Sequence, residues 1–156
     1  MYTYKGEEGE RVPCDATEVQ IQPGVKTVTE FAWENCTSTV SITIPSSVKG
    51  LADYAFIGCS NLTSVNLPTS ITYIGDWAFY GCSSLKTLNL PPSLIFIGRE
   101  AFSECSSLSS VQVPPTLRHI RSFAFHNQPG SLNERTNCRL GTGRVGTNSK
   151  LTHQNW

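Results

Sequence analysis

Apolar and polar residues alternate in short runs that recur along most of the chain. In the stretch 61–82, Val65 and Leu67 alternate with polar neighbours, which is the two-residue period of a β-strand with one buried face. Pro68 follows and lacks the amide hydrogen that a continuing ladder needs. The pattern therefore predicts a strand that ends at this proline.

Two further segments complete the unit. Ile71 and Ile74 predict a brief extended segment with inward side chains. Gly75 is expected to end it by permitting a sharp change of backbone direction. Asp76 is then expected to cap a single helical turn that carries Phe79 into the core.

This unit returns with a fixed period of about 23 residues, within the range typical of repeat proteins. A single unit buries too little apolar surface to offset the entropy of ordering it, so a fixed step of this length indicates a solenoid of stacked coils. The repeating positions include Cys36, Cys59, Cys82 and Cys105, then Ala32, Ala55, Ala78, Ala101 and Ala124, then Trp33, Phe56, Phe79, Phe102 and Phe125, and finally Pro45, Pro68, Pro91 and Pro114.

The recurring motif Leu-x-x-Val-x-Leu-Pro-x-x-Ile-x-x-Ile-Gly-x-x-Ala-Phe-x-x-Cys, seen from Leu62 to Cys82 and again from Leu85 to Cys105, resembles the BspA-like class of leucine-rich repeats. The resemblance implies an α/β leucine-rich-repeat solenoid, a short right-handed coil of about five rungs. Parallel strands would form the concave face, with short extended or one-turn helical segments opposite.

The same resemblance implies a non-enzymatic module that binds a protein partner through its concave strands. Some bacterial members of the family are cell-surface adhesins, so an extracellular module for adhesion or glycan recognition is the alternative. No catalytic residues belong to the repeat. A structural or self-associating fragment is a third, weaker possibility.

Two polar, uncharged columns are predicted on the strand face that points away from the core. They suit hydrogen bonding to a protein or a glycan, but a simply solvated strand face is an equal alternative because aromatic and arginine anchors are missing. The columns are Ser41, Ser64, Thr87 and Ser110, beside Thr43, Asn66, Asn89 and Gln112.

A third column, Tyr73, Phe96 and His119, lies between the inward residues of the second segment and should be partly exposed. Such side chains can anchor a partner, or they can stack on one another from coil to coil, which we favour. The same choice applies to Tyr54, Trp77 and Phe123, which we expect to be structural.

The ends of the chain depart from the period. Residues 1–13 are expected to be a flexible lead-in, residues 14–126 the repeat domain, and residues 127–156 a disordered polar tail. At the end of the array, His126 and Asn127 begin the stretch where the motif expects x-Gly-Cys. The last coil, with Phe123 and Phe125, thus has no evident cap, which invites self-association.

Charge and composition narrow the functional classes. The 12 basic side chains balance 12 acidic ones, so nothing favours a nucleic-acid or membrane partner. The first residues lack the apolar stretch of a secretory signal or membrane helix, which makes a cytoplasmic location the default.

No cofactor, metal or catalytic site is predicted. The stretch Gly141–Gly146 matches G-x-G-x-x-G but lacks the flanking strand and helix of a dinucleotide site. The three histidines are scattered, and the six cysteines form no C-x-x-C pair. Since stacked side chains point the same way, the ladder cysteines are expected to be free, buried thiols rather than disulfides.

Overall fold

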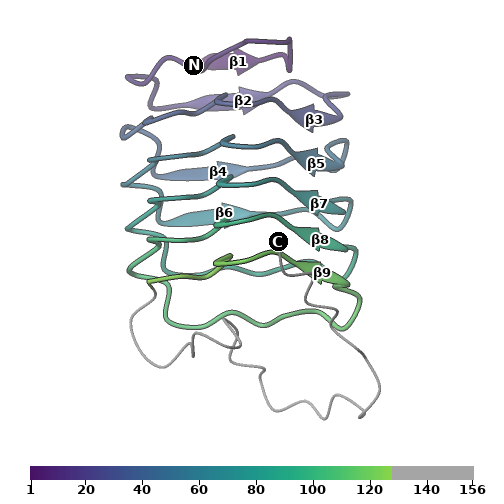
Figure 1. Ribbon diagram of the computed structural model, residues 1–156. Helices are drawn as coiled ribbons and strands as arrows, with labels where there is room; N and C mark the ends of the chain where they lie inside the picture. Colours follow the sequence, from purple (N-terminus) through teal and green to yellow (C-terminus); the bar gives the residue numbers. More distant parts are fainter. Residues whose placement is uncertain (128–156) are drawn as a thin grey trace.

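The computed structural model describes residues 1–127, which form a parallel β-solenoid. Each coil of the chain lies on the preceding one, from the N-terminal β1 to the last strand β9 (Figure 1). Four equal steps separate Thr27 from His119 along the main sheet, so the ladder has about four turns. The solenoid and its period are confirmed, whereas the five complete rungs are not.

The strands are short, as expected for a coil that turns every few residues. Their bounds are β1 Tyr2–Tyr4, β2 Val19–Ile21, β3 Thr27–Val28, β4 Ser41–Thr43, β5 Gly50–Leu51, β6 Ser64–Asn66, β7 Tyr73–Ile74, β8 Phe96–Ile97 and β9 His119–Ile120.

The continuous sheet is formed by the second segment of each unit, not the first. Strands β3, β5, β7, β8 and β9 make one parallel sheet, while β4 pairs only with β6 and β1 only with β2. Further along, the first segment continues through single bridges, such as the one between Asn89 and Gln112. A proline follows the first segment in each unit and removes a ladder donor, whereas none interrupts the second.

Residues 1–127 contain no helix, so the α/β class and the one-turn helical segments are wrong for this part of the chain. In the third segment the amides of Trp77, Phe79 and Gly81 donate to carbonyl oxygens of the next coil at 2.7–3.0 Å. These amides are therefore not available for the hydrogen bonds of a helix within the segment. Trp77 and Gly81 also have positive φ, at 54° and 73°, which breaks helical geometry.

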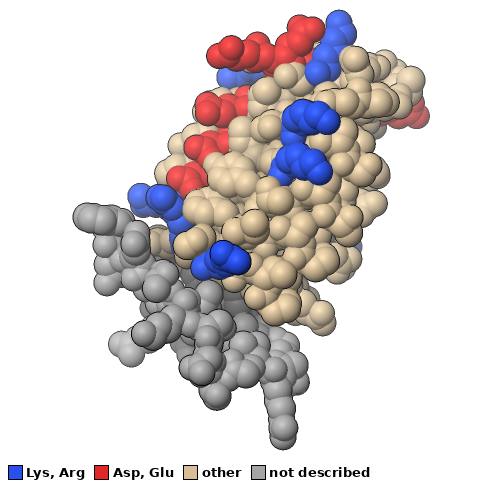
Figure 2. All heavy atoms as spheres, turned by 90° about the vertical axis from the view of Figure 1, so that its right-hand side faces the viewer, with Lys and Arg blue, Asp and Glu red and all other residues tan. Residues whose placement is uncertain are grey.

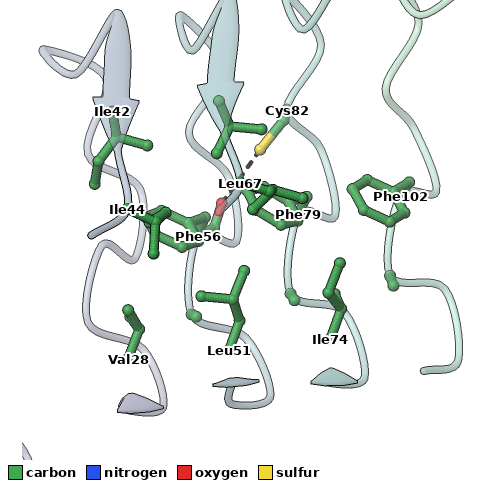
Figure 3. Packing of buried hydrophobic residues seen from close by; sticks show 14 of the residues in the cluster. Val28, Ile42, Ile44, Leu51, Phe56, Leu67, Ile74, Phe79, Cys82 and Phe102 are labelled. Atoms are coloured by element: carbon green, nitrogen blue, oxygen red, sulfur yellow. Dashed lines mark hydrogen bonds between the residues drawn. The ribbon is translucent and has the colours of Figure 1, made fainter. Parts of the chain in front are cut away.

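The core is a continuous column of side chains that crosses the coil boundaries. Its aromatic members stack with ring centroids 4.8–5.2 Å apart, and each is at most 1% exposed. Figure 3 shows Phe56, Phe79 and Phe102 in line, with Leu51 and Ile74 beside them. This core stack comprises Tyr4, Trp33, Phe56, Phe79, Phe102 and Phe125.

Asp76 and Gly75 have different roles from those expected. Asp76 Oδ1 accepts the amide of Arg99 in the next coil at 2.7 Å, and Asp53 Oδ1 accepts the amide of Asp76 at 2.8 Å. Gly75 does not have positive φ; a Cβ there would lie 2.4 Å from Asp53 Oδ1. Each aspartate thus joins its own coil to the next one. Gly75 makes room for Asp53, as Gly98 does for Asp76.

Part of the expected flexible lead-in packs as a cap on the first coil. Strand β1 pairs with β2, and the Tyr4 side chain is fully buried with its hydroxyl 2.8 Å from Thr29 Oγ1. Val12 is also buried. Tyr2 pairs with Val19, an offset shorter than the repeat step, so this pairing has no counterpart elsewhere in the array.

The expected disordered tail lies outside the described residues except for Asn127. This residue occupies the repeat position held by Gly58 and Gly81 and has φ 55°. Asparagine tolerates the left-handed region better than most residues do, so replacing glycine by asparagine at this position preserves the backbone conformation of the coil.

Candidate interaction surfaces

The two polar columns are exposed and aligned as the sequence predicted. All eight side chains are exposed to solvent. Ser41 is in register with Ser64, and Thr43 with Asn66, across β4 and β6. Their role in binding, and the concavity of the face that carries them, stay predictions.

The aromatic column of Tyr73, Phe96 and His119 combines stacking with exposure. The Tyr73 and Phe96 rings are 5.2 Å apart and 20° from parallel, and Phe96 and His119 are 6.4 Å apart and tilted. Tyr73 is 37% exposed and Phe96 half-buried. The expected stacking is confirmed; it covers ring faces and leaves ring edges accessible.

The Tyr73 hydroxyl is held by an acidic neighbour. It donates to Asp53 Oδ1 at 3.1 Å, the oxygen that also accepts the amide of Asp76. Burial and then the negative charge of Asp53 raise the pKa of Tyr73 to about 12. The phenol is therefore a neutral, oriented group at neutral pH.

A second column, which we call the turn column, consists of Phe31, Tyr54 and Trp77. Its rings are nearly parallel, with centroids 4.7 and 5.1 Å apart. The guanidinium groups of Arg11 and Arg99 cover the two ends at 5.4 and 5.5 Å from the ring centres. Tyr54 and Trp77 are therefore closed into a stack with a structural role.

Phe123 differs from the turn column although it has the same repeat position. Glu100 stands between Trp77 and Phe123 in this series of repeat positions and interrupts the aromatic side chains. Phe123 is 51% exposed, and its ring makes an edge contact with His126. The sequence-based assignment missed Phe31 and the two covering arginines. The period itself would have found Phe31, whereas the arginines come from other repeat positions.

Charged side chains lie beside the aromatic column. Glu30, Asp53 and Asp76 share one repeat position, which Arg99 occupies in the following coil. Figure 2, which views the side where β3, β5, β7, β8 and β9 lie in Figure 1, shows a row of acidic side chains and basic groups beside and beyond it. A partly exposed aromatic column beside charges of both signs suits a protein partner.

The cysteine ladder is buried, as predicted. The thiols of Cys59, Cys82 and Cys105 donate to backbone carbonyl oxygens of the preceding coil at 3.0–3.3 Å, and Figure 3 shows the bond from Cys82 to Phe56. Burial raises the pKa of Cys59 and of Cys105 to about 12. These sulfurs pack and bond as thiols, and no disulfide joins them in this structure.

The ladder thiols should therefore be inert in the folded protein. With an aromatic disulfide reagent at mildly alkaline pH, we expect Cys59, Cys82 and Cys105 to react only after urea is added, because the reagent needs an accessible thiolate. Exposed Cys14 should react at once. Peptide mass mapping of the labelled sites checks this, and rapid native labelling of Cys82 would contradict it.

Within residues 1–127 no cluster of three or more His, Cys, Asp or Glu side chains could hold a metal ion. In the same range, no helix has the length and apolarity to cross a bilayer. His119 lies against Phe96. The glycine motif at 141–146 lies outside the described residues.

The comparisons with known proteins agree with this geometry. The family model for the BspA type leucine rich repeat region matches residues 12–131 in six copies. No curated protein matches the chain.

Solved structures of bacterial proteins are also similar. A leucine-rich repeat protein of T. pallidum is 33% identical with a TM-score of 0.65, over 80% of this chain and 57% of that one. A leucine-rich cell surface protein of Faecalibacterium prausnitzii is 31% identical with a TM-score of 0.68, over 81% of this chain and 35% of that one. The chain thus spans less than two thirds of either relative.

Repeat proteins of this kind are generally non-enzymatic and commonly serve as interaction or surface modules. The period, the stacked coils and the matched region lead to one assignment. The chain belongs to the BspA-type leucine-rich repeat family.

Proposed function

We propose that the protein is a non-enzymatic module that binds a partner protein through the aromatic column and the residues beside it. One observation carries this choice. Five large apolar side chains are exposed in residues 1–127, and Tyr73, Ile95 and Phe123 among them come from the second segment or the turn after it. Exposed apolar groups on a surface that also carries charged side chains are typical of binding surfaces.

The anchoring chemistry favours this surface over the polar columns. Binding energy at protein interfaces concentrates in tyrosine, tryptophan and arginine side chains, and this surface carries Tyr73 and the exposed Arg121. Arg121 also covers the Phe96 ring at 5.7 Å. The polar columns carry only short uncharged side chains, which contribute less per residue.

The experiment compares the binding of a partner protein by two variants of the chain. Tyr73→Ala with His119→Ala removes two exposed anchors and leaves half-buried Phe96 in place. Asn66→Ala, Asn89→Ala and Gln112→Ala alter the polar columns. Circular dichroism must first show that both variants keep the wild-type fold.

A protein retained by wild type in a pull-down is then purified and titrated by calorimetry. We expect the aromatic variant to weaken binding by at least about tenfold, the effect of losing one hot-spot residue, while the polar variant stays within about twofold. The reverse ranking would move the site to the polar columns. Unchanged binding by both variants would refute both surfaces.

The second candidate function is adhesion outside the cell. It is favoured by the similar F. prausnitzii structure, whose name describes a cell surface protein. Glycan binding would use the polar columns, since the aromatic column offers ring edges rather than a flat ring face. A glycan array bound by wild type but not by the polar variant supports this function instead.

Self-association through the last coil makes a separate prediction. If the end of the solenoid pairs with a second copy, the mass measured by light scattering will rise with protein concentration. Phe123→Ser would then restore a constant mass because Phe123 is the exposed apolar group of that coil. A constant monomer mass for wild type removes this candidate.

A further inference from the structure

The N-terminal cap, residues 1–14, closes one end of the apolar column. Its strand β1 pairs with β2, and the Val12 amide donates to the Ala32 carbonyl oxygen at 2.8 Å. Tyr4 stacks against Trp33 with centroids 4.8 Å apart. If this cap opens, Trp33 and the first coil lose their cover, so the attachment of the cap matters for the whole array.

A pair of cysteines lies where the cap joins the first ladder coil. The sulfur of Cys14 is 3.2 Å from the sulfur of Cys36. Both sulfurs also lie near the carbonyl oxygen of Glu34, at 3.5 and 3.7 Å. Cys36 is fully buried, whereas Cys14 is exposed.

This pair differs from the cysteine ladder in the way its side chains meet. The four ladder cysteines occupy one repeat position, so their side chains point in parallel, and each thiol, that of Cys36 included, lies near a backbone carbonyl oxygen, which for Cys36 is that of Val12 at 3.4 Å. Cys14 lies one residue outside the ladder position, and its side chain converges on Cys36. Small shifts of two side chains would bring these sulfurs to bonding distance.

We propose that Cys14 and Cys36 form a disulfide under oxidising conditions, and that this bond fastens the N-terminal cap to the first coil. The oxidant is a small disulfide such as oxidised glutathione. The exposed Cys14 is the entry point, because a reagent can reach it without unfolding the coil.

The exchange proceeds in two steps. The Cys14 thiolate attacks one sulfur of the small disulfide and releases one small thiolate, which leaves a mixed disulfide on Cys14. Cys36 gives up its proton and attacks the Cys14 sulfur, which releases the second small thiolate. The protein loses two thiol protons and two electrons, and the oxidant becomes two thiols.

The second step should be slow. Burial, together with the neighbouring Cys14 sulfur, raises the pKa of the Cys36 thiol, so little of it is thiolate at neutral pH. The mixed disulfide on Cys14 is therefore expected to accumulate before the bridge closes. A reducing environment would return both cysteines to thiols by the reverse exchange.

The first test is the connectivity of the bridge. The full chain carrying Cys138→Ser, which removes a competing thiol, is incubated with oxidised glutathione, alkylated and digested with trypsin. Cleavage after Arg11, Lys26 and Lys49 places Cys14 in peptide 12–26 and Cys36 in peptide 27–49. We expect these two peptides linked, and separated by a reductant.

Two results would overturn the connectivity. The first is a disulfide between peptide 12–26 and another ladder peptide, such as the one that contains Cys59 and Cys82. Complete recovery of peptides 12–26 and 27–49 as separate species, alkylated or bearing glutathione after prolonged incubation, is the second. Either result means that the contact between the Cys14 and Cys36 sulfurs does not become a disulfide.

The second test is stability. A bridge that closes the loop from residue 14 to residue 36 restricts the unfolded chain, so oxidation should raise Tm by at least about 5 °C. The matched control is Cys14→Ser, an exposed and conservative change, for which the oxidant should leave Tm unchanged. Equal shifts in both proteins, or none in the parent, would contradict the proposed fastening.

Discussion

Replacing Phe79 by alanine is expected to lower the free energy of unfolding by about 3–5 kcal/mol. The ring is fully buried and stacks on Phe56 and Phe102 at 5.0 and 5.1 Å, both within 6° of parallel. Truncation leaves a void in the middle of the core stack, with coils on both sides. Since a domain of this size is stable by only about 5–15 kcal/mol, the loss is a large share of the total.

Urea unfolding monitored by circular dichroism measures this effect as a drop in the midpoint. The matched control is Phe123→Ala, which deletes the same atoms from a ring that is 51% exposed. That change should cost less than about 1 kcal/mol. Similar losses in the two variants would mean that the stacked core is not what holds the coils together.

The second large effect is expected from Gly98→Ala. A Cβ at this position would lie 2.4 Å from Asp76 Oδ1 and 2.5 Å from two backbone atoms, the nitrogen of Asp76 and the carbonyl carbon of Gly75. The backbone cannot swing aside as a flexible side chain would. We expect a loss of about 3 kcal/mol, at the upper end of the range for overpacking.

Gly50→Ala is the matched control for Gly98→Ala. Gly50 also lies on the main-sheet side and lacks positive φ, but its added Cβ would meet the Tyr73 ring at an ordinary 3.4 Å. This change should be neutral or stabilise by up to about 1 kcal/mol, because alanine has less freedom in the unfolded chain. If both variants unfold at the same urea concentration, the close contact between Gly98 and Asp76 is not a constraint.

The Asp–Gly arrangement has a signal in the amino-acid sequence. Asp53 comes with Gly75, and Asp76 with Gly98, each glycine one position short of a full repeat step from its aspartate. Where the aspartate position holds Arg99, the glycine position holds Arg121. The constant spacing between the two positions is visible in the sequence, whereas the reason for it is visible only in the structure.

The N-terminal cap shows a different limit. Tyr2 and Tyr4 alternate with polar residues as strand residues do, but the segment is short, and the offset at which it pairs with β2 does not match the period. Because this pairing occurs only once in the chain, the repeat period could not predict it. The burial of Tyr4 depends on Thr29 and Trp33, which are distant in sequence.

The candidate surfaces were predicted in part. Exposure of the polar columns and stacking of the aromatic column followed from alternation within each unit and from the step between units. The hydrogen bond from Tyr73 to Asp53 could not be predicted in this way, because Asp53 comes from the preceding coil and a different segment. The closure of the turn column by Arg11 and Arg99 was missed for the same reason.

The amino-acid sequence by itself determined the period, the stacking of coils and the side chains that face the core, because alternation and spacing are local and recur at positions such as those of Phe79 and Cys82. Only the tertiary structure decided which segment carries the continuous sheet and that no helix forms in residues 1–127. Those outcomes depend on whether each amide donates within its own segment or to the next coil, and that choice exists only once the coils lie against each other.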